Sequence, residues 1–271
     1  MNSVRRWIVT HPKPAKVILV ILITAFGFFA LDPQVYSFGI RFLIMFSMLY
    51  SAVLLVNAMP MKLLRKPIEM LEQQCDPYPF LAEVEHLIAA CPNNPQKHFY
   101  QIHHALALVF TGQMDQALEV MEHIPMDQAP PQIKLLYHCN FCDLLFHLGQ
   151  FEASSLHHEK ALEIYAQMPD SRAKKSWEHT MELNAIEENY RDGDYALALR
   201  KLSRIPCPTK RYVIEGALLA ARCNLAMEDY DKATEKLQYV IDNGNKLYFV
   251  AEAKRLMIQI SAKSIHQEEQ S

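Results

Sequence analysis

The stretch Gly193-Asp194-Tyr195-Ala196-Leu197-Ala198 contains the pattern that predicts the fold of this chain. A turn residue is followed after two positions by a large side chain and after five positions by a small one. The pattern occurs three more times, as Gly112 with Met114 and Ala117, as Gly149 with Phe151 and Ser154, and as Glu228 with Tyr230 and Ala233. The intervals between successive turn residues are 37, 44 and 35 residues. Recurrence at such a period is typical of helical repeat proteins.

The longest interval is explained by the positions of the prolines. A proline follows the turn residue after 13 residues in two repeats and after 20 residues in the repeat of Gly149; these prolines are Pro125, Pro206 and Pro169. The distance is 24 residues from Pro125 to Gly149 and again from Pro169 to Gly193. Seven extra residues correspond to about two helical turns. We therefore predict that the helix after Gly149 is two turns longer than its counterparts.

The soluble part of the chain has the pattern of helices throughout. From about residue 78, apolar residues recur at steps of three and four, glycine is rare, and runs of β-branched residues are absent. The breakers are Pro92–Pro95, Pro125, Pro130-Pro131, Pro169, Pro206–Pro208 and Asn243-Gly244. The segments between them have the length of helix–turn–helix pairs. We expect an all-α protein.

The spacing resembles that of the tetratricopeptide repeat, a helical hairpin of about 34 residues. The glycine, aromatic and alanine of that family's turn match best at Gly193, Tyr195 and Ala198. The resemblance covers residues 98–242 and implies an α-solenoid of about four degenerate repeats, in which the large residue fills the hairpin interior and the small one allows close approach. Helices expected at Tyr78–Ala90 and Leu247–Ser264 would cap the two ends.

The chain departs from the family in its first helices. The early position where the family favours tryptophan or leucine is occupied by Gln101, His138, Glu182 and Ala217. In the third and fourth repeats the mid-helix aromatic position is displaced by one residue, onto Tyr190 and Leu225. The register of the first helices is therefore predicted to within one residue.

Two uncharged apolar runs precede the repeats. Residues 17–31 are fifteen residues without a charge, and residues 42–59 are eighteen. Apolar runs of this kind are typical of membrane spans, and extension of the first run by its flanking residues makes up for its short length. We expect a transmembrane helical hairpin with spans at about 15–32 and 40–59.

A cleavable signal peptide is the competing interpretation of the first run. Its exit, from Gly27 to Leu31, lacks the small-x-small pattern that a signal peptidase needs. Four bases precede the first span and three follow the second, against only Arg41 in the connection. By the positive-inside rule we expect a multi-pass protein of the cell membrane, with its N-terminus and its repeat domain in the cytoplasm.

Charge separates the chain into two parts. Residues 1–66 contain eight Lys/Arg and a single acid, Asp32, whereas the remaining residues contain 19 Lys/Arg and 29 Asp/Glu. An acidic body repels phosphate, so we expect no nucleic-acid partner. The expected domains are a membrane anchor (1–66), a linker with an N-terminal capping helix (67–97), the repeats (98–246), and a C-terminal capping helix with a tail (247–271).

The cysteines do not form a recognisable framework. They lie at positions 75, 91, 139, 142, 207 and 223, and we expect free thiols in a reducing compartment over disulfides. Cys139-x-x-Cys142 lacks the second pair of a zinc site and the strand–helix context of a redox pair. The resemblance places Cys142 at the family's small, buried position, so a structural role is expected.

Other candidate residues for chemistry have ordinary structural explanations. Adjacent histidines on a helix point about 100° apart, so one member of His103-His104 and of His157-His158 is expected to be half-buried and the other solvated. The bases of Arg172-Ala-Lys174-Lys175 are expected in a solvated loop. Glycine-rich phosphate loops and nucleophile turns are absent from the sequence. We predict no catalytic, cofactor-binding or metal-binding residue.

The resemblance implies a peptide-binding groove. In tetratricopeptide domains the first helix of each repeat lines the inner face, and asparagines there hydrogen-bond the backbone of an extended peptide. The implied peptide-binding residues are His103, Asn140, Asp143, Asn184, Glu187, Tyr190 and Arg222. Acids replace the family's basic clamp for a C-terminal carboxylate, so we expect a basic or amide-rich partner segment. The alternative, that Asn140 and Asn184 are simply solvated, stays open.

These expectations favour a membrane-anchored adaptor that binds a cytosolic protein or peptide on its concave face, without catalysis or a small-molecule substrate. The alternative is a structural subunit of a membrane protein complex that packs through its transmembrane hairpin. Ser47 and Ser51 are four residues apart in the second span and could form a helix–helix contact. A membrane enzyme with an unrecognised site is a third possibility.

Overall fold

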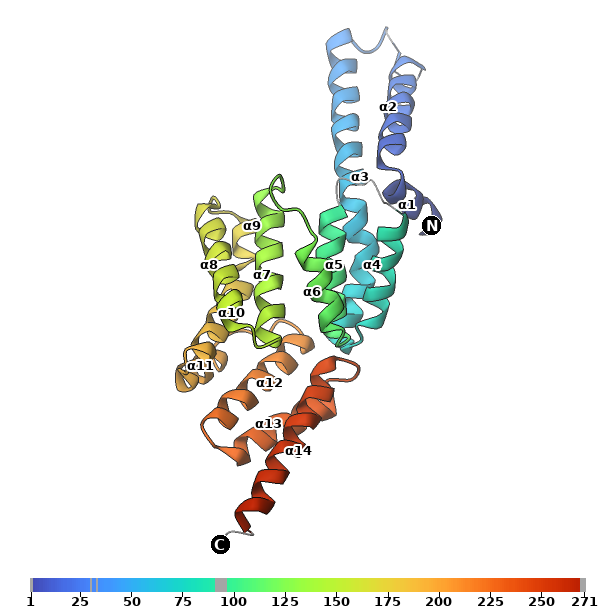
Figure 1. Ribbon diagram of the computed structural model, residues 1–271. Helices are drawn as coiled ribbons and strands as arrows, with labels where there is room; N and C mark the ends of the chain where they lie inside the picture. The colour runs from blue at the N-terminus through green and yellow to red at the C-terminus, as the bar shows by residue number, and fades with distance from the viewer. Residues whose placement is uncertain (1, 30, 33, 91–96, 269–271) are drawn as a thin grey trace. The chain divides into compact units, whose positions relative to one another are not determined.

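The computed structural model describes residues 2–29, 31–32, 34–90 and 97–268. These residues form helices and contain no strand, which confirms the predicted all-α class (Figure 1). The helices are α1 (Asn2–Thr10), α2 (Pro12–Phe29), α3 (Phe38–Gln74), α4 (Tyr78–Ala90), α5 (Lys97–Phe110), α6 (Met114–Glu122), α7 (Pro131–His147), α8 (Phe151–Gln167), α9 (Arg172–Lys175), α10 (Glu178–Arg191), α11 (Tyr195–Leu202), α12 (Lys210–Ala226), α13 (Tyr230–Asn243) and α14 (Tyr248–Glu268).

The chain divides into two compact units. The first contains the residues up to 67 together with 83–97, and the second contains 68–82 and 98–271. Helices α3 and α4 each contribute residues to both units. The bounds of α4 are those predicted for the N-terminal capping helix. The breakers Pro92–Pro95 and Cys91 lie outside the described residues.

The first unit contains a helix segment that could span a membrane. Of the described helices, α3 alone is long and apolar enough, over Phe38–Val56, with a mean hydropathy of 2.0 and only 6% of that segment buried. This segment overlaps the second predicted span. A Cβ atom added at Gly27 of α2 would overlap the side chain of Met45 of α3, so these two helices pack closely there. The first predicted span overlaps α2 and stays a prediction.

Helix α3 continues well beyond this apolar segment. It is a single helix of 37 residues that includes Pro60 and Pro67, although an interior proline removes one backbone hydrogen bond. Its last turns, Ile68–Gln74, belong to the second unit. Leu71 is 2% exposed and Cys75, directly after the helix, is 0% exposed. The end of α3 is therefore part of the core of the second unit.

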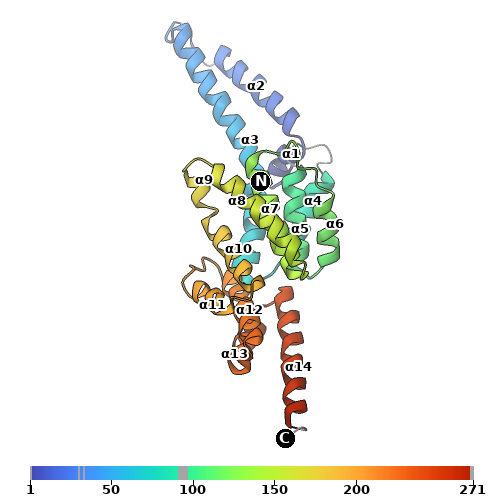
Figure 2. The ribbon, with the colours of Figure 1, turned by 60° about the vertical axis from the view of Figure 1, so that its left-hand side comes forward.

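The second unit contains four pairs of helices at the positions of the predicted repeats. The first helices of the pairs are α5, α7, α10 and α12, and the second helices are α6, α8, α11 and α13. Helix α7 packs on α8, α10 on α11, and α12 on α13 (Figures 1 and 2). The four predicted turn residues join the helices of the pairs and have left-handed φ angles: Gly112 82°, Gly149 74°, Gly193 82° and Glu228 61°. The predicted turn positions are confirmed.

The small residues of the pattern are completely buried. Ala117, Ser154, Ala198 and Ala233 are each 0% exposed. Helix α8 has 17 residues, whereas α6 has 9 and α11 has 8, which confirms the extension relative to the repeats closed by Pro125 and Pro206. Helix α13 has 14 residues, so the two-turn difference does not hold for the last pair. The large residue of the pattern differs from expectation, because Phe151 is 40% exposed and Tyr195 is only half-buried. Each is the first residue of its helix, so no preceding turn covers it.

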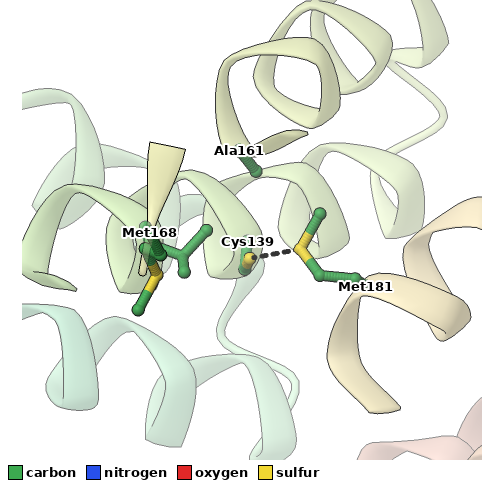
Figure 3. Close-up of a cluster of buried hydrophobic side chains, with 5 residues drawn as sticks. Cys139, Ala161, Met168 and Met181 are labelled. Carbon is green, nitrogen blue, oxygen red and sulfur yellow. Dashed lines mark hydrogen bonds between the residues drawn. The ribbon is translucent and has the colours of Figure 1, made fainter. Parts of the chain in front are cut away.

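A buried cluster joins the second and third pairs. Leu135 and Cys139 of α7 pack against Ala161 of α8 and Met181 of α10, with Met168 after α8 (Figure 3). The Sγ of Cys139 lies 3.8 Å from the Sδ of Met181. Buried side chains of this cluster thus join the first helices α7 and α10.

The connection between α13 and α14 is bonded to the connection between α3 and α4. The backbone N–H of Lys246 donates to the carbonyl of Cys75 at 3.2 Å, and its Nζ lies 2.6 Å from Oδ2 of Asp76. The Nδ2 of Asn245 donates to the carbonyl of Gln74 at 2.8 Å. Helix α14 is the predicted C-terminal helix, and these bonds fix its start to the end of α3.

The basic run after α8 is not the loop that was predicted. Arg172–Lys175 form the one-turn helix α9, in which the backbone N–H of Lys174 donates to Oγ of Ser171. The ammonium of Lys174 donates to the carbonyl of Met168 at 3.1 Å and lies 5.0 Å from the ring centre of Tyr165. A capping serine and these two contacts give the segment a helical turn that the base-rich composition did not indicate.

Candidate functional site

One cavity of about 250 Å³ lies among the first helices of the second unit. We call it the first-helix cavity. Its walls come from the end of α3, from Phe80, and from the four first helices: Ile68, Leu71, Glu72, Phe80, His103, Leu106, Phe110, Leu136, Cys139, Asn140, Asp143, Trp177, Thr180, Leu183, Asn184, Glu187, Arg211, Tyr212 and Glu215. Among the described residues, no residue of a second helix lines it.

Sequence register explains why these side chains meet. Asn140 and Asn184 stand nine residues before their turn residues, and Asp143 and Glu187 stand six before. Steps of three and four residues place side chains on one face of a helix. These positions of α7 and α10 therefore face one space, which His103 of α5 also lines, whereas Leu219 and Arg222 at the same positions of α12 do not line it.

Arg211 of α12 is the central cation of this cavity. Its Nε lies 2.8 Å from Oε1 of Glu72, and its Nη1 lies 2.6 Å from Oε2 of Glu215. The guanidinium stacks 3.8 Å from the ring centre of Tyr212 and lies 4.9 Å from that of Phe110. Burial acts to lower the pKa of Arg211, but the carboxylates of Glu72 and Glu215 raise it by more, so the guanidinium stays charged.

Glu215 keeps a raised pKa in spite of its arginine. Burial raises the pKa of Glu215 to about 7, while the charge of Arg211 acts to lower it. The carboxylate of Asp143 adds to the rise. A buried carboxylate beside other carboxylates is expected to hold its proton to a higher pH.

A second group of polar side chains adjoins the cavity. His147 Nε2 lies 3.1 Å from Oδ1 of Asp143, and Nη1 of Arg222 lies 3.4 Å from Nδ1 of His147. Since arginine can only donate, Nδ1 of His147 accepts and its Nε2 carries the hydrogen that faces Asp143. Burial acts to raise the pKa of Asp143, but His147, Arg211 and Arg222 together lower it by more.

Two buried polar groups of α10 lack partners. Glu187 is 5% exposed and Asn184 is 3% exposed. Oε2 of Glu187 and Nδ2 of Asn184 are buried without a hydrogen bond. Burial raises the pKa of Glu187 well above its usual value, and the carboxylates of Asp143 and Glu215 raise it further. An unpaired buried polar group costs about 1–3 kcal/mol, so this cavity carries a cost that a ligand could offset.

His103 and Asn140 also belong to the polar lining, and they differ in whether their polar atoms have hydrogen-bond partners. The ring of His103 lies 4.2 Å from that of Phe99 and 5.9 Å from that of Phe80, and its Nδ1 is buried without a partner. Burial lowers the pKa of His103 to about 4. Asn140 donates instead to the carbonyl of Leu136 at 2.7 Å. The two predicted asparagines are therefore not equivalent.

Five of the seven predicted peptide-binding residues line this one cavity: His103, Asn140, Asp143, Asn184 and Glu187. The other two, Tyr190 and Arg222, line a second cavity of about 380 Å³ together with residues of α13 and α14. Tyr190 packs there against Phe146 and Tyr195. Arg222 reaches Glu252 at 3.5 Å. The structure thus divides the predicted set between two adjoining sites.

The sequence prediction missed Arg211, Glu215 and Glu72. Glu215 stands 13 residues before its turn residue, as do Leu136 and Thr180, which also line the cavity. This register could have identified Glu215, but the residue types at that position share no chemistry. The contribution of Glu72 depends on the fold, since 139 residues separate it from Arg211.

Three side chains of this region form a possible metal site. One donor atom each of Asp143, His147 and Glu215 lies within 4.8 Å of the others. A metal would need the Nε2 lone pair of His147, which carries a hydrogen in the tautomer that Arg222 selects. A metal bound at Nε2 would require the ring hydrogen of His147 to be on Nδ1, where it would point at the guanidinium of Arg222. The arginine therefore opposes metal binding here.

The remaining chemical candidates are buried structural groups. Burial raises the pKa of Cys142 to about 12 and raises that of Cys139 as well. Both remain thiols at neutral pH, whereas the thiolate is the form that binds metal or attacks disulfides. The cysteines at 75, 139, 142, 207 and 223 are free. The buried structural position predicted for Cys142 is confirmed by its 0% exposure.

The prediction that one histidine of each adjacent pair is solvated is wrong. His158 is 1% exposed, and His157 is half-buried, with its Nδ1 3.2 Å from Nδ1 of His138 and its ring 4.3 Å from that of Phe141. His103 and His104 are both half-buried. Helix α8 is covered on two faces, since His157 lies against His138 of α7 and His158 lies 3.3 Å from Glu188 of α10.

Compared with the models of known protein families, with curated proteins and with solved structures, the chain matches none.

Proposed function

We propose that this chain is a membrane-anchored adaptor whose helix pairs form a tetratricopeptide-like α-solenoid and bind a protein or peptide segment through the first helices. The observation that carries the proposal is that the described lining of the first-helix cavity comes from all four first helices and from none of the second helices. Unpaired polar atoms of Asn184 and Glu187 in this lining are available to a ligand. A peptide offers the donors and acceptors that these groups lack.

The proposal includes an anchor of two transmembrane helices at about 15–32 and 40–59. Exposed apolar residues over Phe38–Val56 and the close packing of α2 on α3 support it. The bases that flank the two runs favour a cytoplasmic N-terminus and a cytoplasmic helix-pair unit. Tethering raises the local concentration of a bound segment at the bilayer, so a modest affinity suffices for this role.

The groove is tested by a pair of double variants. Asn140→Ala with Asn184→Ala is expected to abolish capture of the partner from detergent-solubilised membranes, with the tag placed at Ser271. Ser47→Leu with Ser51→Leu is expected to leave capture intact. Loss of capture in the serine variant alone would refute groove binding.

The second candidate function is a structural subunit of a membrane protein complex. Ser47 and Ser51 are both exposed on α3, and small polar residues four apart favour close helix–helix contacts in membranes. Under this function the serine double variant loses the associated subunits and the asparagine double variant keeps them.

A further inference from the structure

Carboxyl groups outnumber cationic groups in the lining of the first-helix cavity. Its carboxylates are Glu72, Asp143, Glu187 and Glu215, and its one guanidinium among the described lining is Arg211. Both short ion pairs of Arg211 go to Glu72 and Glu215. The short ion pairs of Arg211 do not include Asp143 or Glu187. Asp143 lies beside His147 and its pKa is lowered by that residue, Arg211 and Arg222, whereas the pKa of Glu187 stays raised although Arg191 and Arg222 act to lower it.

Glu187 is the clearest position for a missing cation. Its side chain is buried, and its Oε2 has no hydrogen-bond partner. Asn184, one turn earlier on the same face of α10, also has a buried amide nitrogen without a partner. Two unsatisfied groups on one wall of a cavity are costly unless a ligand provides their partners: a donor for the oxygen of Glu187, and an acceptor such as a backbone carbonyl of the bound segment for the amide nitrogen of Asn184.

The size and the walls of the cavity indicate what kind of group fits. Its volume of about 250 Å³ is below the roughly 300–1,000 Å³ of cavities that hold drug-sized ligands, so it suits a single side chain. Phe80 and Trp177 supply apolar and aromatic walls. A long side chain with an alkyl stem and a charged head can pack its stem on such walls while its head reaches a carboxylate.

We infer that the first-helix cavity receives one lysine or arginine side chain of the bound segment, with its cationic head against Glu187 and Asp143. This inference rests on the proposed function, since the segment that brings the side chain is the segment bound by the first helices. It adds the chemical identity of the residue that anchors that segment.

A consequence is that binding releases a proton. The groups that face Glu187 from the helices packed around it are Asp143, Cys142, Glu215, Arg222 and, on its own helix, Arg191. Burial, Asp143 and Glu215 hold the pKa of Glu187 well above its usual value, while the two arginines act to lower it. The empty site therefore binds a proton that an entering cation displaces. Affinity is expected to rise with pH until the pKa of the empty site is passed.

The test uses a tryptophan of the site as its reporter. The chain has two tryptophans, Trp7 and Trp177, so Trp7→Phe in the full chain in detergent leaves Trp177 alone. The probes are blocked pentapeptides Ala-Ala-X-Ala-Ala, in which X is lysine, arginine, glutamine or norleucine, titrated to millimolar concentration. Saturable changes in Trp177 fluorescence are expected for lysine and arginine only. A response that does not distinguish the four peptides, or no response, overturns the inference.

A charge-removing variant completes the test. Glu187→Gln keeps the shape of the side chain and is expected to weaken binding of the lysine peptide by about 30-fold or more. Calorimetry in buffers of different ionisation enthalpy should find proton release on binding in the parent and less release in this variant. Glu163→Gln, on the exposed face of α8, is the matched control and should change neither value. Equal affinity of Glu187→Gln and the control contradicts the inference.

Two further outcomes distinguish this inference from its alternatives. In the first, Trp177 fluorescence responds saturably to zinc chloride but not to the lysine peptide, and Asp143→Asn removes the response. This would show that the cavity binds a metal ion and would overturn the inference. A second outcome uses a variant of the captured segment in which every lysine and arginine is changed to norleucine. If this segment is still captured, while the asparagine double variant captures nothing, the inferred cationic anchor is refuted and the proposed function stands. If the asparagine variant leaves capture intact, the proposed function itself fails.

Discussion

Gly193 and Glu228 adopt the same left-handed backbone conformation, with φ angles of 82° and 61°, at the same turn of two successive helix pairs. Glycine occupies this conformation freely, whereas a residue with a side chain pays about 1–2 kcal/mol. The structure places nothing within 4 Å of a Cβ at Gly193, so conformation alone decides the effect of a substitution.

Gly193→Ala is therefore expected to destabilise the protein by about 1 kcal/mol, and Glu228→Gly to stabilise it by about 0.5–1 kcal/mol. The distinctive result is that the two variants change the free energy of unfolding in opposite directions. Chemical denaturation of the two variants in the same detergent measures both values. If Glu228→Gly destabilised the protein, the equivalence of the two turns would be refuted.

Arg211 is expected to be among the most costly side chains to remove. Its loss leaves the buried carboxylates of Glu72 and Glu215 without a cation, and breaking a buried pair typically costs about 3–5 kcal/mol. Arg211→Leu should show this loss in the free energy of unfolding. Arg200→Leu, at an exposed position of α11, should stay within about 0.5 kcal/mol of the parent. Similar small effects of both would show that Arg211 does not join α3 to α12.

Stability is expected to fall in mild acid because of His103. Its pKa falls from 6.5 to about 4 on folding, since burial disfavours the charged ring. Unfolded chains therefore bind a proton between these values that the folded protein does not, and stability present above pH 6.5 is lost as the pH falls toward 4. The contribution amounts to at most about 3 kcal/mol. In His103→Phe the loss of stability between pH 7 and 5 should be smaller, and an unchanged profile would contradict the assignment.

Thiol reactivity should distinguish one described cysteine from the rest. Cys207 is exposed, whereas Cys75, Cys139, Cys142 and Cys223 are buried. Burial also raises the pKa of Cys223 to about 12. Iodoacetamide is expected to label Cys207 in the native protein and the four buried thiols only after denaturation, as peptide mass spectrometry would record. Native labelling of Cys142 would mean that the packing of α7 on α8 is looser than described.

Local features of the fold were predictable because their causes are local. The turn at Gly193 follows from the conformational freedom of glycine, and the turn at Glu228 was found by its spacing, although glutamate gives no turn signal of its own. The longer α8 followed from the displaced Pro169. The exposure of Phe151 was missed, because a periodic pattern does not reveal that a residue begins its helix.

The candidate site was predictable only where register determines it. Asn184 and Glu187 were placed by counting back from the turn, and both line the first-helix cavity. Arg211 and Glu72 were missed because they meet through a contact between α3 and α12, far apart in the sequence. The continuation of α3 through Pro67 into the second unit was equally inaccessible, since tertiary packing there overrides a residue that usually ends helices.

The central claim is that a partner segment binds along the first helices, and site-specific photocrosslinking tests it most directly. A benzoylphenylalanine at Thr180, which lines the first-helix cavity, is compared in native membranes with one at Leu162, which is 43% exposed on α8. Crosslinks to one defined partner peptide from position 180, and none from position 162, are the predicted result. Crosslinking of the same partner from position 162 alone, or from both positions alike, would contradict the account.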